Sequence, residues 1–505
     1  MRHDEFRTRY IVKLVSSVLI AIINIIIQLI LPRALSVDDY GFYTFNLNVF
    51  TSIVTMATLS VPSAMVSKFS KRNNEIGHIY FYIFFSIAII MLLNIVIIGI
   101  VFSKWYDKIF SGQVLTTVIL GLETSIVLRV FTDNIGIFDA MAIARYPAVV
   151  QIVSKIVIFI SVICIYFFNE LTLTSFYSIQ IITIGLLSVL MVYSAIKEIK
   201  KGNVIVNRGL YHYAKEYFEF CKPLVLYNIF SQFVIIFMNW VLLKNGGAVE
   251  QAMFGAAWQL NTLVSYVFSP YAELSKREFA VNVKNNHQLK ILYEKSLRLM
   301  MWLTSYFAIY IALGSKWLLP IVFGNKYEGA TIVTILIMYY TIFQAWGQIA
   351  GAFLLATEQT KMQAKLGIIN QFVMITFTFL FQVPNFIWEN GLGANGIGLT
   401  YLCSVIINVA LSLYINSKYL GMKFLSLWKI QIIPLALLSA MMCLLRIIID
   451  NLILGNSLIH NIVKTMFSGT IYTLVCIIVL FNFPQMISVE NNSFIIKIKE
   501  RLIKK

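Results

Sequence analysis

The stretch IVKLVSSVLIAIINIIIQLIL, from Ile11 to Leu31, decides the fold class of this chain. Its only charged residue is Lys13. A helix of this length, rising ~1.5 Å per residue, crosses the ~30 Å of a bilayer's hydrocarbon core. The stretch is longer than a signal-peptide core, and no small-residue cleavage site precedes Pro32. We therefore expect it to be retained as a transmembrane helix.

The composition extends this conclusion to the whole chain. Of its 505 residues, 59% are hydrophobic and 12% are charged, whereas a typical soluble protein has ~45–50% and ~25%. No Pro-, Ser- or Gly-rich stretch separates soluble domains. We predict an all-α polytopic membrane protein with about 14 transmembrane helices. The predicted spans lie near residues 9–31, 41–66, 79–102, 113–138, 147–168, 174–195, 223–243, 251–272, 293–313, 329–355, 364–386, 393–415, 428–449 and 461–481.

The basic residues are divided unequally between the two sides that these spans define. Of 40 Lys and Arg residues, 29 fall in the termini and loops of one side, and seven fall on the other. Since cytoplasmic segments are enriched in Lys and Arg, both termini are predicted to be cytoplasmic. The net charge of +17 therefore reflects orientation. It does not indicate nucleic-acid binding, because the basic residues form no single footprint. The two longest loops, 196–222 and 273–292, are predicted to be amphipathic segments on the cytoplasmic surface.

Two pairs of short matches indicate an internal duplication. The segment PSAMVSK at 62–68 resembles PYAELSK at 270–276, and GIF at 136–138 resembles GAF at 351–353, at offsets of 208 and 215 residues. Repeats with an even number of spans share one orientation and are related by an axis along the membrane normal. We predict two six-helix bundles in a parallel pseudo-repeat, at 1–200 and 201–422, then two additional helices at 423–485 and a basic cytoplasmic tail at 486–505.

Three segments carry a resemblance to a known family: LPRALSVDDYGFY at 31–43, PIVFGNKYEGA at 320–330 and GLGANGIG at 391–398. They resemble recurring elements of the bacterial polysaccharide flippases, which belong to the multidrug/oligosaccharidyl-lipid/polysaccharide exporter superfamily. Within the first segment, we expect Asp38 and Asp39 to cap a helix and Gly41 to allow close packing. We assign no ligand to these residues.

The resemblance implies two six-helix bundles around a central cavity that opens alternately to each side of the bacterial cytoplasmic (inner) membrane. The implied cargo is an undecaprenyl-pyrophosphate-linked oligosaccharide repeat unit, moved to the outer leaflet for synthesis of O-antigen, lipopolysaccharide or another surface polysaccharide. The implied partners are the lipid bilayer, a proton or sodium ion that supplies energy, and the polymerase and chain-length regulator of the same pathway.

Three alternative functions stay open at this point. The same superfamily contains multidrug or cation antiporters, which are expected to have a deep carboxylate site, and the peptidoglycan-precursor flippase. A membrane polysaccharide polymerase would need a large outer loop with catalytic residues, and the predicted outer loops are short. The chain contains no Walker A loop, nucleophile elbow or metal-ligand spacing, and its five cysteines and five histidines are scattered. We expect no catalytic residue, metal or cofactor.

Few ionisable residues lie inside the predicted spans, where such groups are costly and usually functional or paired. Arg129 and Lys155 lie on consecutive spans, both ~12–14 Å from the cytoplasmic ends at ~1.5 Å per residue. Given the implied cargo, they are our candidates for binding its pyrophosphate. The alternative is that Arg129 pairs with Asp133 one turn away and ties helices together. Glu123 is a candidate for coupling to an ion gradient.

Uncharged polar residues along four spans either bind sugar hydroxyls or join helices. Two pairs stand out because the first and seventh spans are equivalent in the predicted repeat, and each carries an Asn and a Gln four residues apart. These pairs, Asn24 with Gln28 and Asn228 with Gln232, are our candidates for lining the cavity. The other residues considered are Asn239, Gln259, Asn261, Gln344 and Gln348.

Overall fold

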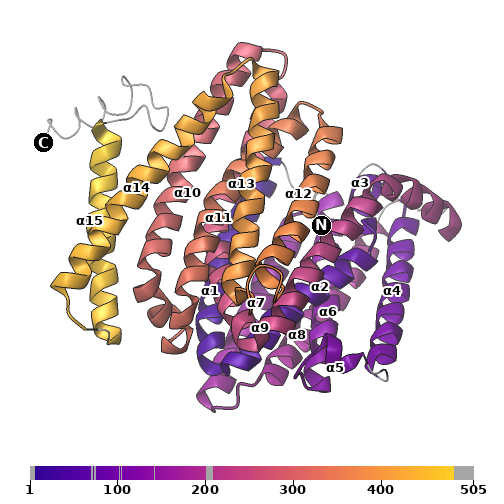
Figure 1. Cartoon of the computed structure of the whole chain (residues 1–505). Coiled ribbons are helices and arrows are strands. Elements are labelled where there is room, and N and C mark those ends of the chain that lie inside the picture. The colour runs from indigo at the N-terminus through magenta and orange to yellow at the C-terminus, as the bar shows by residue number, and fades with distance from the viewer. Residues whose placement is uncertain are drawn as a thin grey trace, which may run out of the picture. The chain divides into compact units, whose positions relative to one another are not determined.

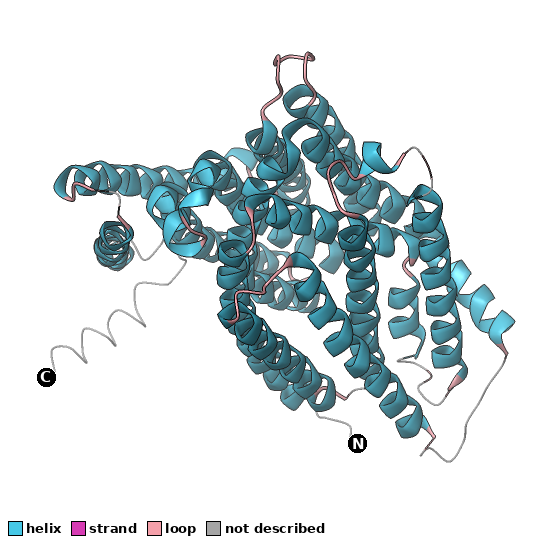
Figure 2. Cartoon of the chain, turned by 90° about the horizontal axis from the view of Figure 1, so that it is seen from below, coloured by secondary structure: helices cyan, strands magenta, loops and turns pink. Residues whose placement is uncertain are grey.

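The computed structural model describes residues 6–69, 72, 75–101, 103, 105–141, 143–200, 209–455 and 457–482. Within these ranges the chain is helical and contains no strand (Figure 2). The prediction of an all-α membrane protein is therefore confirmed. The predicted tail at 486–505 lies outside the described residues.

Twelve of the described helices are long and apolar enough to cross a membrane. Two features account for the difference from the fourteen predicted spans. The spans at 223–243 and 251–272 belong to one long helix, α9 (Leu210–Asn282), which is broken at Gly247, where φ is 77° and ψ is −176°. The span at 41–66 falls on the shorter α2 (Val37–Ala57) and α3 (Val61–Phe69), neither of which is among the twelve.

The prediction of one continuous span over 41–66 was wrong. The chain leaves the helix between α2 and α3, where Leu59 and Ser60 have φ values of 48° and 65°. Residues with side chains seldom adopt this left-handed conformation, so a helix cannot continue through it. Ser36 caps the start of α2 by accepting a hydrogen bond from the amide of Asp39 at 3.0 Å. The capping that we expected of Asp38 and Asp39 is therefore provided by Ser36.

By packing, the chain divides into two compact units, Met1–Ala252 and Met253–Lys505. The boundary lies inside α9. The predicted bundles at 1–200 and 201–422 were defined by the sequence duplication instead, and they stay a prediction.

In the first unit, α6 is the central helix. It packs against α2, α3 and α8, whereas α7 packs against α1 and α8. A core of apolar side chains from α2, α4 and α6 fills the space between them. The remaining helices of this unit are α1 (Phe6–Ala34), α4 (Gly77–Val101), α5 (Tyr106–Ile109), α6 (Leu115–Ala140), α7 (Arg145–Phe167) and α8 (Leu173–Ile199).

In the second unit, α11 packs against α10 and α13, and α12 packs against α13. The last two helices lie beside α10 and beside each other (Figure 1). Hydrogen bonds fasten them there, including those from Tyr310 to the carbonyl of Thr465 and from Trp317 to Asp450. The elements of this unit are α10 (Asn286–Val322), η1 (Asn325–Ala330), α11 (Thr331–Ala356), α12 (Thr360–Gln382), α13 (Gly393–Leu420), α14 (Phe424–Leu452) and α15 (Leu458–Asn482).

The predicted surface segment at 273–292 is mostly helix. Only residues 283–285 separate the end of α9 from the start of α10. The segment at 196–222 does contain an amphipathic helix, because α9 begins at Leu210 and buries Tyr213, Tyr217 and Cys221 at four-residue spacing. This spacing places the three side chains on one face of the helix.

Candidate functional site

A polar cavity of about 520 Å³ lies within the second unit. Its walls come from the second half of α9 and from α11, α12 and α13. The lining residues are Ser269, Ala272, Lys276, Tyr340, Gln344, Gly347, Gln348, Gly351, Ala352, Leu355, Gln363, Asn370, Met374, Tyr401, Ser404, Val405 and Asn408.

Two glycines on α11, one turn apart, shape one wall of this cavity. A Cβ atom built on Gly351 would lie 3.2 Å from the side-chain nitrogen of Gln363 on α12, which is closer than side chains normally pack. A Cβ atom on Gly347 would meet Val409 of α13 at 3.4 Å. Small residues at this spacing let membrane helices approach each other closely. The absence of side chains at Gly347 and Gly351 also leaves space for the amide side chains of the cavity wall.

The cavity is polar but nearly uncharged. Its wall combines the amides of Gln344, Gln348, Gln363, Asn370 and Asn408 with hydroxyl groups from Tyr340, Tyr401, Ser269 and Ser404. Each amide carries both donors and acceptors, which matches the mixed hydrogen bonding of a sugar hydroxyl. Lys276 is the single charged side chain in the described lining. An arrangement of this kind suits a neutral polyhydroxylated ligand with one anionic end.

Aromatic rings hold the tyrosines of this wall in place. The rings of Tyr340 and Tyr401 meet edge to face at 5.2 Å between centroids, and the ring of Trp258 lies 4.9 Å from that of Tyr401. Edge-to-face pairs of this kind are favourable beyond the area that they bury. The two tyrosines are therefore fixed features of the wall, with their hydroxyl-bearing rings against the cavity.

The structure pairs Arg129 with Asp133. The Nε atom of Arg129 lies 3.2 Å from both carboxylate oxygens of Asp133, and the hydroxyl of Tyr82 donates to Asp133 at 2.5 Å. Asp133 is buried, and the Arg129 side chain is 27% exposed. This geometry matches the structural alternative stated for Arg129. A cavity beside the pair is lined by both side chains together with Tyr82 and Ser86.

Lys155 is half-buried on α7, and Arg129 lies on α6. Both helices pack on α8, but α7 also packs on α1, whereas α6 also packs on α2 and α3. Glu123 is half-buried on α6. The pyrophosphate and coupling roles of these residues stay predictions.

Three of the nine candidate amides form hydrogen bonds to other groups of the protein. The amide of Asn228 donates to the carbonyl of Thr55 at 3.2 Å, and the carbonyl oxygen of Asn239 accepts from Gln251 at 2.9 Å. Asn261 accepts from Thr341 at 2.8 Å. Half-buried side chains are found at Asn24, Gln28 and Gln232.

Only Gln344 and Gln348, among the amides considered from sequence, line the polar cavity. Sequence reasoning missed the wall provided by α12 and α13. A signal was present in the spacing, because Tyr401, Ser404 and Asn408 recur at three and four residues, as expected for one face of a helix.

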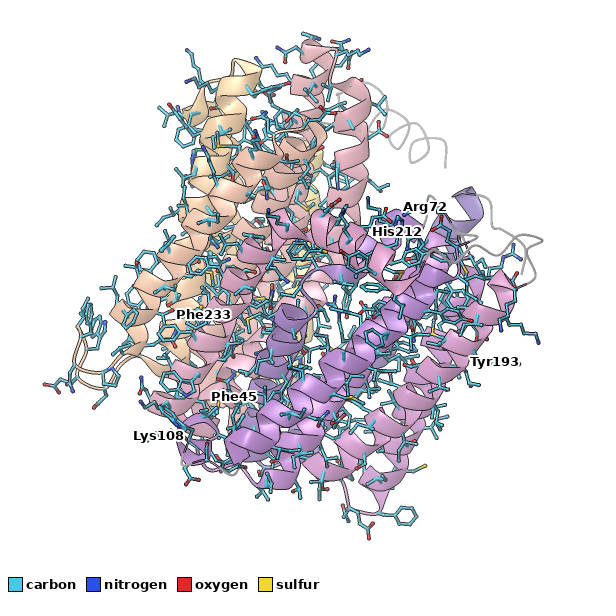
Figure 3. The ribbon with its side chains drawn as sticks, turned by 90° about the vertical axis from the view of Figure 1, so that its right-hand side faces the viewer. Phe45, Arg72, Lys108, Tyr193, His212 and Phe233 are labelled. Carbon is cyan, nitrogen blue, oxygen red and sulfur yellow. The ribbon has the colours of Figure 1, made fainter. Side chains whose placement is uncertain are left out.

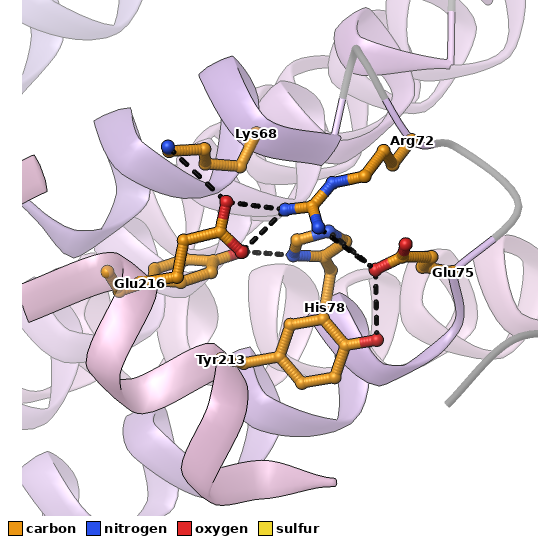
Figure 4. A network of polar contacts seen from close by, with 7 residues as sticks. Lys68, Arg72, Glu75, His78, Tyr213 and Glu216 are labelled. Atoms are coloured by element: carbon orange, nitrogen blue, oxygen red, sulfur yellow. Dashed lines mark hydrogen bonds and ion pairs between the residues drawn. The ribbon is translucent and has the colours of Figure 1, made fainter. Parts of the chain in front are cut away.

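A second charged cluster lies in the first unit, between the segment that joins α3 to α4 and the start of α9 (Figure 4). Arg72 donates to both carboxylate oxygens of Glu216, at 2.6 and 2.5 Å, and Lys68 lies 3.3 Å from the same carboxylate. Behind this ion pair, Glu75 is buried and accepts from the hydroxyl of Tyr213 at 3.1 Å. We refer to Lys68, Arg72, Glu75, His78, Tyr213, Glu216 and Tyr217 as the α3–α9 cluster.

Electrostatics favour the ionised form of the central pair. Burial opposes ionisation of Glu216, but the hydrogen bonds and charges of Arg72 and Lys68 outweigh it, so its pKa lies below the usual value. The hydrogen bonds to Glu216 raise the pKa of Arg72. Close packing supports the cluster, since a Cβ atom on Gly77 would overlap the ring of Tyr213.

No protein-family model matches the chain, and no curated protein matches it in sequence. Solved structures do match. The lipid II flippase MurJ in an inward closed conformation is 15% identical with a TM-score of 0.69, covering 94% of this chain and 99% of that one. The inward-facing conformation of a multidrug resistance MATE family transporter of the MOP superfamily is 13% identical with a TM-score of 0.61, covering 80% and 95%.

A MOP superfamily transporter from Pyrococcus furiosus matches as well, at 13% identity and a TM-score of 0.51, covering 82% of this chain and 97% of that one. The chain has the fold of these transporters. This is the fold that the sequence resemblance implied. The neighbours named here are transporters and a flippase rather than enzymes. At sequence identities of 13–15%, these matches show the fold and neither the family nor the transported molecule.

Proposed function

We propose that this protein is a flippase for a lipid-linked oligosaccharide, moving an undecaprenyl-pyrophosphate-linked repeat unit to the outer leaflet of the bacterial cytoplasmic membrane by alternating access. The observation that carries the proposal is the polar, nearly uncharged cavity of the second unit. Polar groups inside a membrane protein are costly unless they pair or serve a passing ligand. A wall of amides and tyrosines supplies the hydrogen bonds that sugar hydroxyls lose when they leave water.

Lys276 gives this cavity a positive end. The positive-inside count predicts that Lys276 is on the cytoplasmic side, where the cargo would enter. A lysine ammonium attracts the charged oxygens of a pyrophosphate as a point charge. Arg129 and Lys155 remain proposed contacts for the same head group in the first unit. The proton or sodium coupling and the partnership with a polymerase remain proposals with the cargo.

The proposal can be tested by reconstitution and complementation. Proteoliposomes with a fluorescent undecaprenyl-pyrophosphate oligosaccharide report translocation, and a strain lacking its own oligosaccharide flippase reports surface polymer. We expect the wild-type chain to act in both assays. Replacing both Gln344 and Gln348 with Leu should slow translocation about thirtyfold, since two lost hydrogen bonds of ~1 kcal/mol each total ~2 kcal/mol.

A matched control is available on α12. Gln371→Leu removes the same amide beside Asn370 but outside the cavity lining, and it should transport normally. Lys276→Gln should weaken binding of the charged substrate, whereas Lys276→Arg should retain that binding. Full transport by the Gln344→Leu/Gln348→Leu variant, at equal protein level, would remove the cavity from the proposal.

A second candidate cargo is the peptidoglycan precursor. The favouring observation is the match to the lipid II flippase, which extends over 94% of this chain. Lipid II in the same proteoliposomes separates the two cargoes, and export of dyes without either lipid would favour a multidrug antiporter instead.

A further inference from the structure

The first unit contains an apolar pocket that shares no lining residue with the polar cavity. It has a volume of about 350 Å³ and lies between α2, α4, α5, α6 and the first half of α9. Every lining side chain is aliphatic or aromatic. Its rings come from both sides, with Phe45 and Phe50 on α2 facing Phe233, Phe237 and Trp240 on α9.

The pocket has an open mouth and a closed floor. Val96 on α4 and Phe233 on α9 are 49% and 51% exposed, whereas Phe50 and Leu122 are 0% and 1% exposed. Val96 and Phe233 both lie in stretches apolar enough to span a membrane. An apolar slot open at this level admits hydrocarbon at no desolvation cost, because its surroundings are hydrocarbon already.

One end of the pocket is marked by two lysines. The indole nitrogen of Trp240 donates to the backbone carbonyl of Lys108 at 3.2 Å, which joins α9 to α5. The Nζ atom of Lys244 lies 4.8 Å from the centre of the Trp240 ring, and that of Lys108 lies 5.2 Å from the Trp105 ring. The first cation–π contact holds the Lys244 ammonium group over the Trp240 ring, which lines the pocket, and the second holds the Lys108 ammonium group over Trp105, directly before α5.

This end is opposite to the α3–α9 cluster. Figure 3 shows Lys108 and Phe45 at one end of the helices of this unit and Arg72 and His212 at the other. The charge count predicts that the end with Lys108 faces outward, where only seven of the 40 basic residues fall. With Asp107 on the same short helix, Lys108 and Lys244 still leave a net positive charge there.

We propose that this pocket binds the polyprenyl tail of the translocated lipid on the outer side, with its phosphate beside Lys108 and Lys244. The inference rests on the proposed function, because that function delivers a polyprenyl lipid to this side. The chemistry is complementary, since a charge-free slot takes the chain and the ammonium groups attract the head at the interface.

Photolabelling of the full chain in phosphatidylcholine nanodiscs tests the proposal. The probe is a polyprenyl monophosphate with a diazirine near the far end of its tail, and labelled peptides are identified by mass spectrometry. We expect label on peptides that line the pocket. Ile236→Trp, which fills the pocket from α9, should reduce that labelling about tenfold.

Ile229→Trp is the matched control, because it adds the same bulk two turns away on the same helix and outside the pocket lining. It should label like the wild type. Lys108→Gln and Lys244→Gln should each weaken binding of the phosphate probe about fivefold, and they should leave an uncharged polyprenol probe unaffected. Lys244→Arg should keep the affinity.

Two results would overturn the proposal. The first is wild-type label that maps only to peptides outside the pocket, a result that needs no variant to fold. The second is an Ile236→Trp variant, monodisperse by gel filtration, that keeps full labelling. The proposed function is judged separately by translocation of the sugar-bearing lipid, so a wild-type chain that translocates without labelling this pocket refutes only the tail site.

Discussion

At the scale of single residues, Asp133 shows how a charge is retained inside a membrane helix. It is buried, and it receives hydrogen bonds from Arg129 on its own helix and from Tyr82 on α4. Taking away one partner leaves the other charge unsatisfied, and this usually costs more than the intact pair contributes. The pair can therefore be structural, functional or both, and the two roles can be separated by experiment.

Arg129→Ala should lower stability by about 2 kcal/mol, because it leaves the Asp133 carboxylate with one fewer donor. The double variant Arg129→Leu/Asp133→Leu should recover most of that loss. Thermal unfolding of the purified protein in detergent measures both. If the double variant is stable but does not transport, Arg129 contacts the cargo. Equal destabilisation in the single and double variants would contradict the ion-pair account.

Gly351 offers a test of the cavity wall at a single position. Gly351→Leu should abolish most transport, because its side chain would occupy the cavity and displace Gln363. Gly314→Leu is a comparable change on α10, where a Cβ atom meets only flexible side chains at 3.5 Å or more. It should transport better than Gly351→Leu at equal protein level. The reverse order would show that the wall is not part of the transport path.

At the scale of elements, the α3–α9 cluster fastens the first turns of α9 to the segment that follows α3. Its central bond is the two-oxygen contact between Arg72 and Glu216, with Lys68 beside it. Tyr213 and Tyr217 place the apolar side of the same helix against this segment, and Tyr217 lies 2.9 Å from Nδ1 of His78. The ion pair of Glu216 and the packing of the two tyrosines therefore both hold the start of α9 against this segment.

Glu216→Gln should loosen the start of α9. We expect hydrogen exchange of residues 209–222 to rise about tenfold, because the variant leaves two cations without their carboxylate. Glu219→Gln, an exposed position on the same helix, is the control and should leave exchange unchanged. Unchanged exchange in Glu216→Gln would show that tyrosine packing alone holds the segment.

The pH dependence of this contact follows from the lowered pKa of Glu216. A carboxylate whose pKa is lower in the folded state contributes stability above its unfolded pKa and loses it as the pH falls through the folded value. The contact should be complete at neutral pH and fail only in acid. Exchange of residues 209–222, corrected for intrinsic rates, should converge on that of Glu216→Gln at low pH.

The elements themselves were largely predictable, and the reasons for the exceptions are specific. Most spans follow from local hydropathy, which needs no knowledge of neighbours. The break at Leu59 and Ser60 was not predictable, because Leu and Ser seldom adopt a positive φ and no Gly or Asn beside them signals a turn. The Arg129–Asp133 pair was foreseen as an alternative, since four-residue spacing places both on one helix face.

The cavity was less predictable than the spans. Lipid is as apolar as a protein core, so hydropathy does not say which face of a membrane helix looks inward. Asn370 on α12 and Asn408 on α13 were missed for this reason, although they lie beside the predicted Gln344 and Gln348 in the cavity wall.

At the scale of the whole molecule, the predicted orientation can be tested directly. In a background without the five native cysteines, Lys108→Cys should react with a membrane-impermeant maleimide in intact cells, whereas Lys365→Cys should react only after lysis. Both positions are exposed in the structure. The opposite pattern would place both termini outside and would reverse the direction of the proposed transport.

Gly41 has a consequence for how relatives of this chain are sorted. A side chain there would overlap the carbonyl oxygen of Ala248, and Tyr43 packs edge to face against Phe176. The segment 31–43 thus serves helix capping and packing. We therefore expect this segment to be shared by proteins with the same fold, whatever molecule they transport. Relatives that share it but carry different cargoes should differ instead at the amides and tyrosines of the polar cavity, so those positions are the ones to compare when a cargo is assigned.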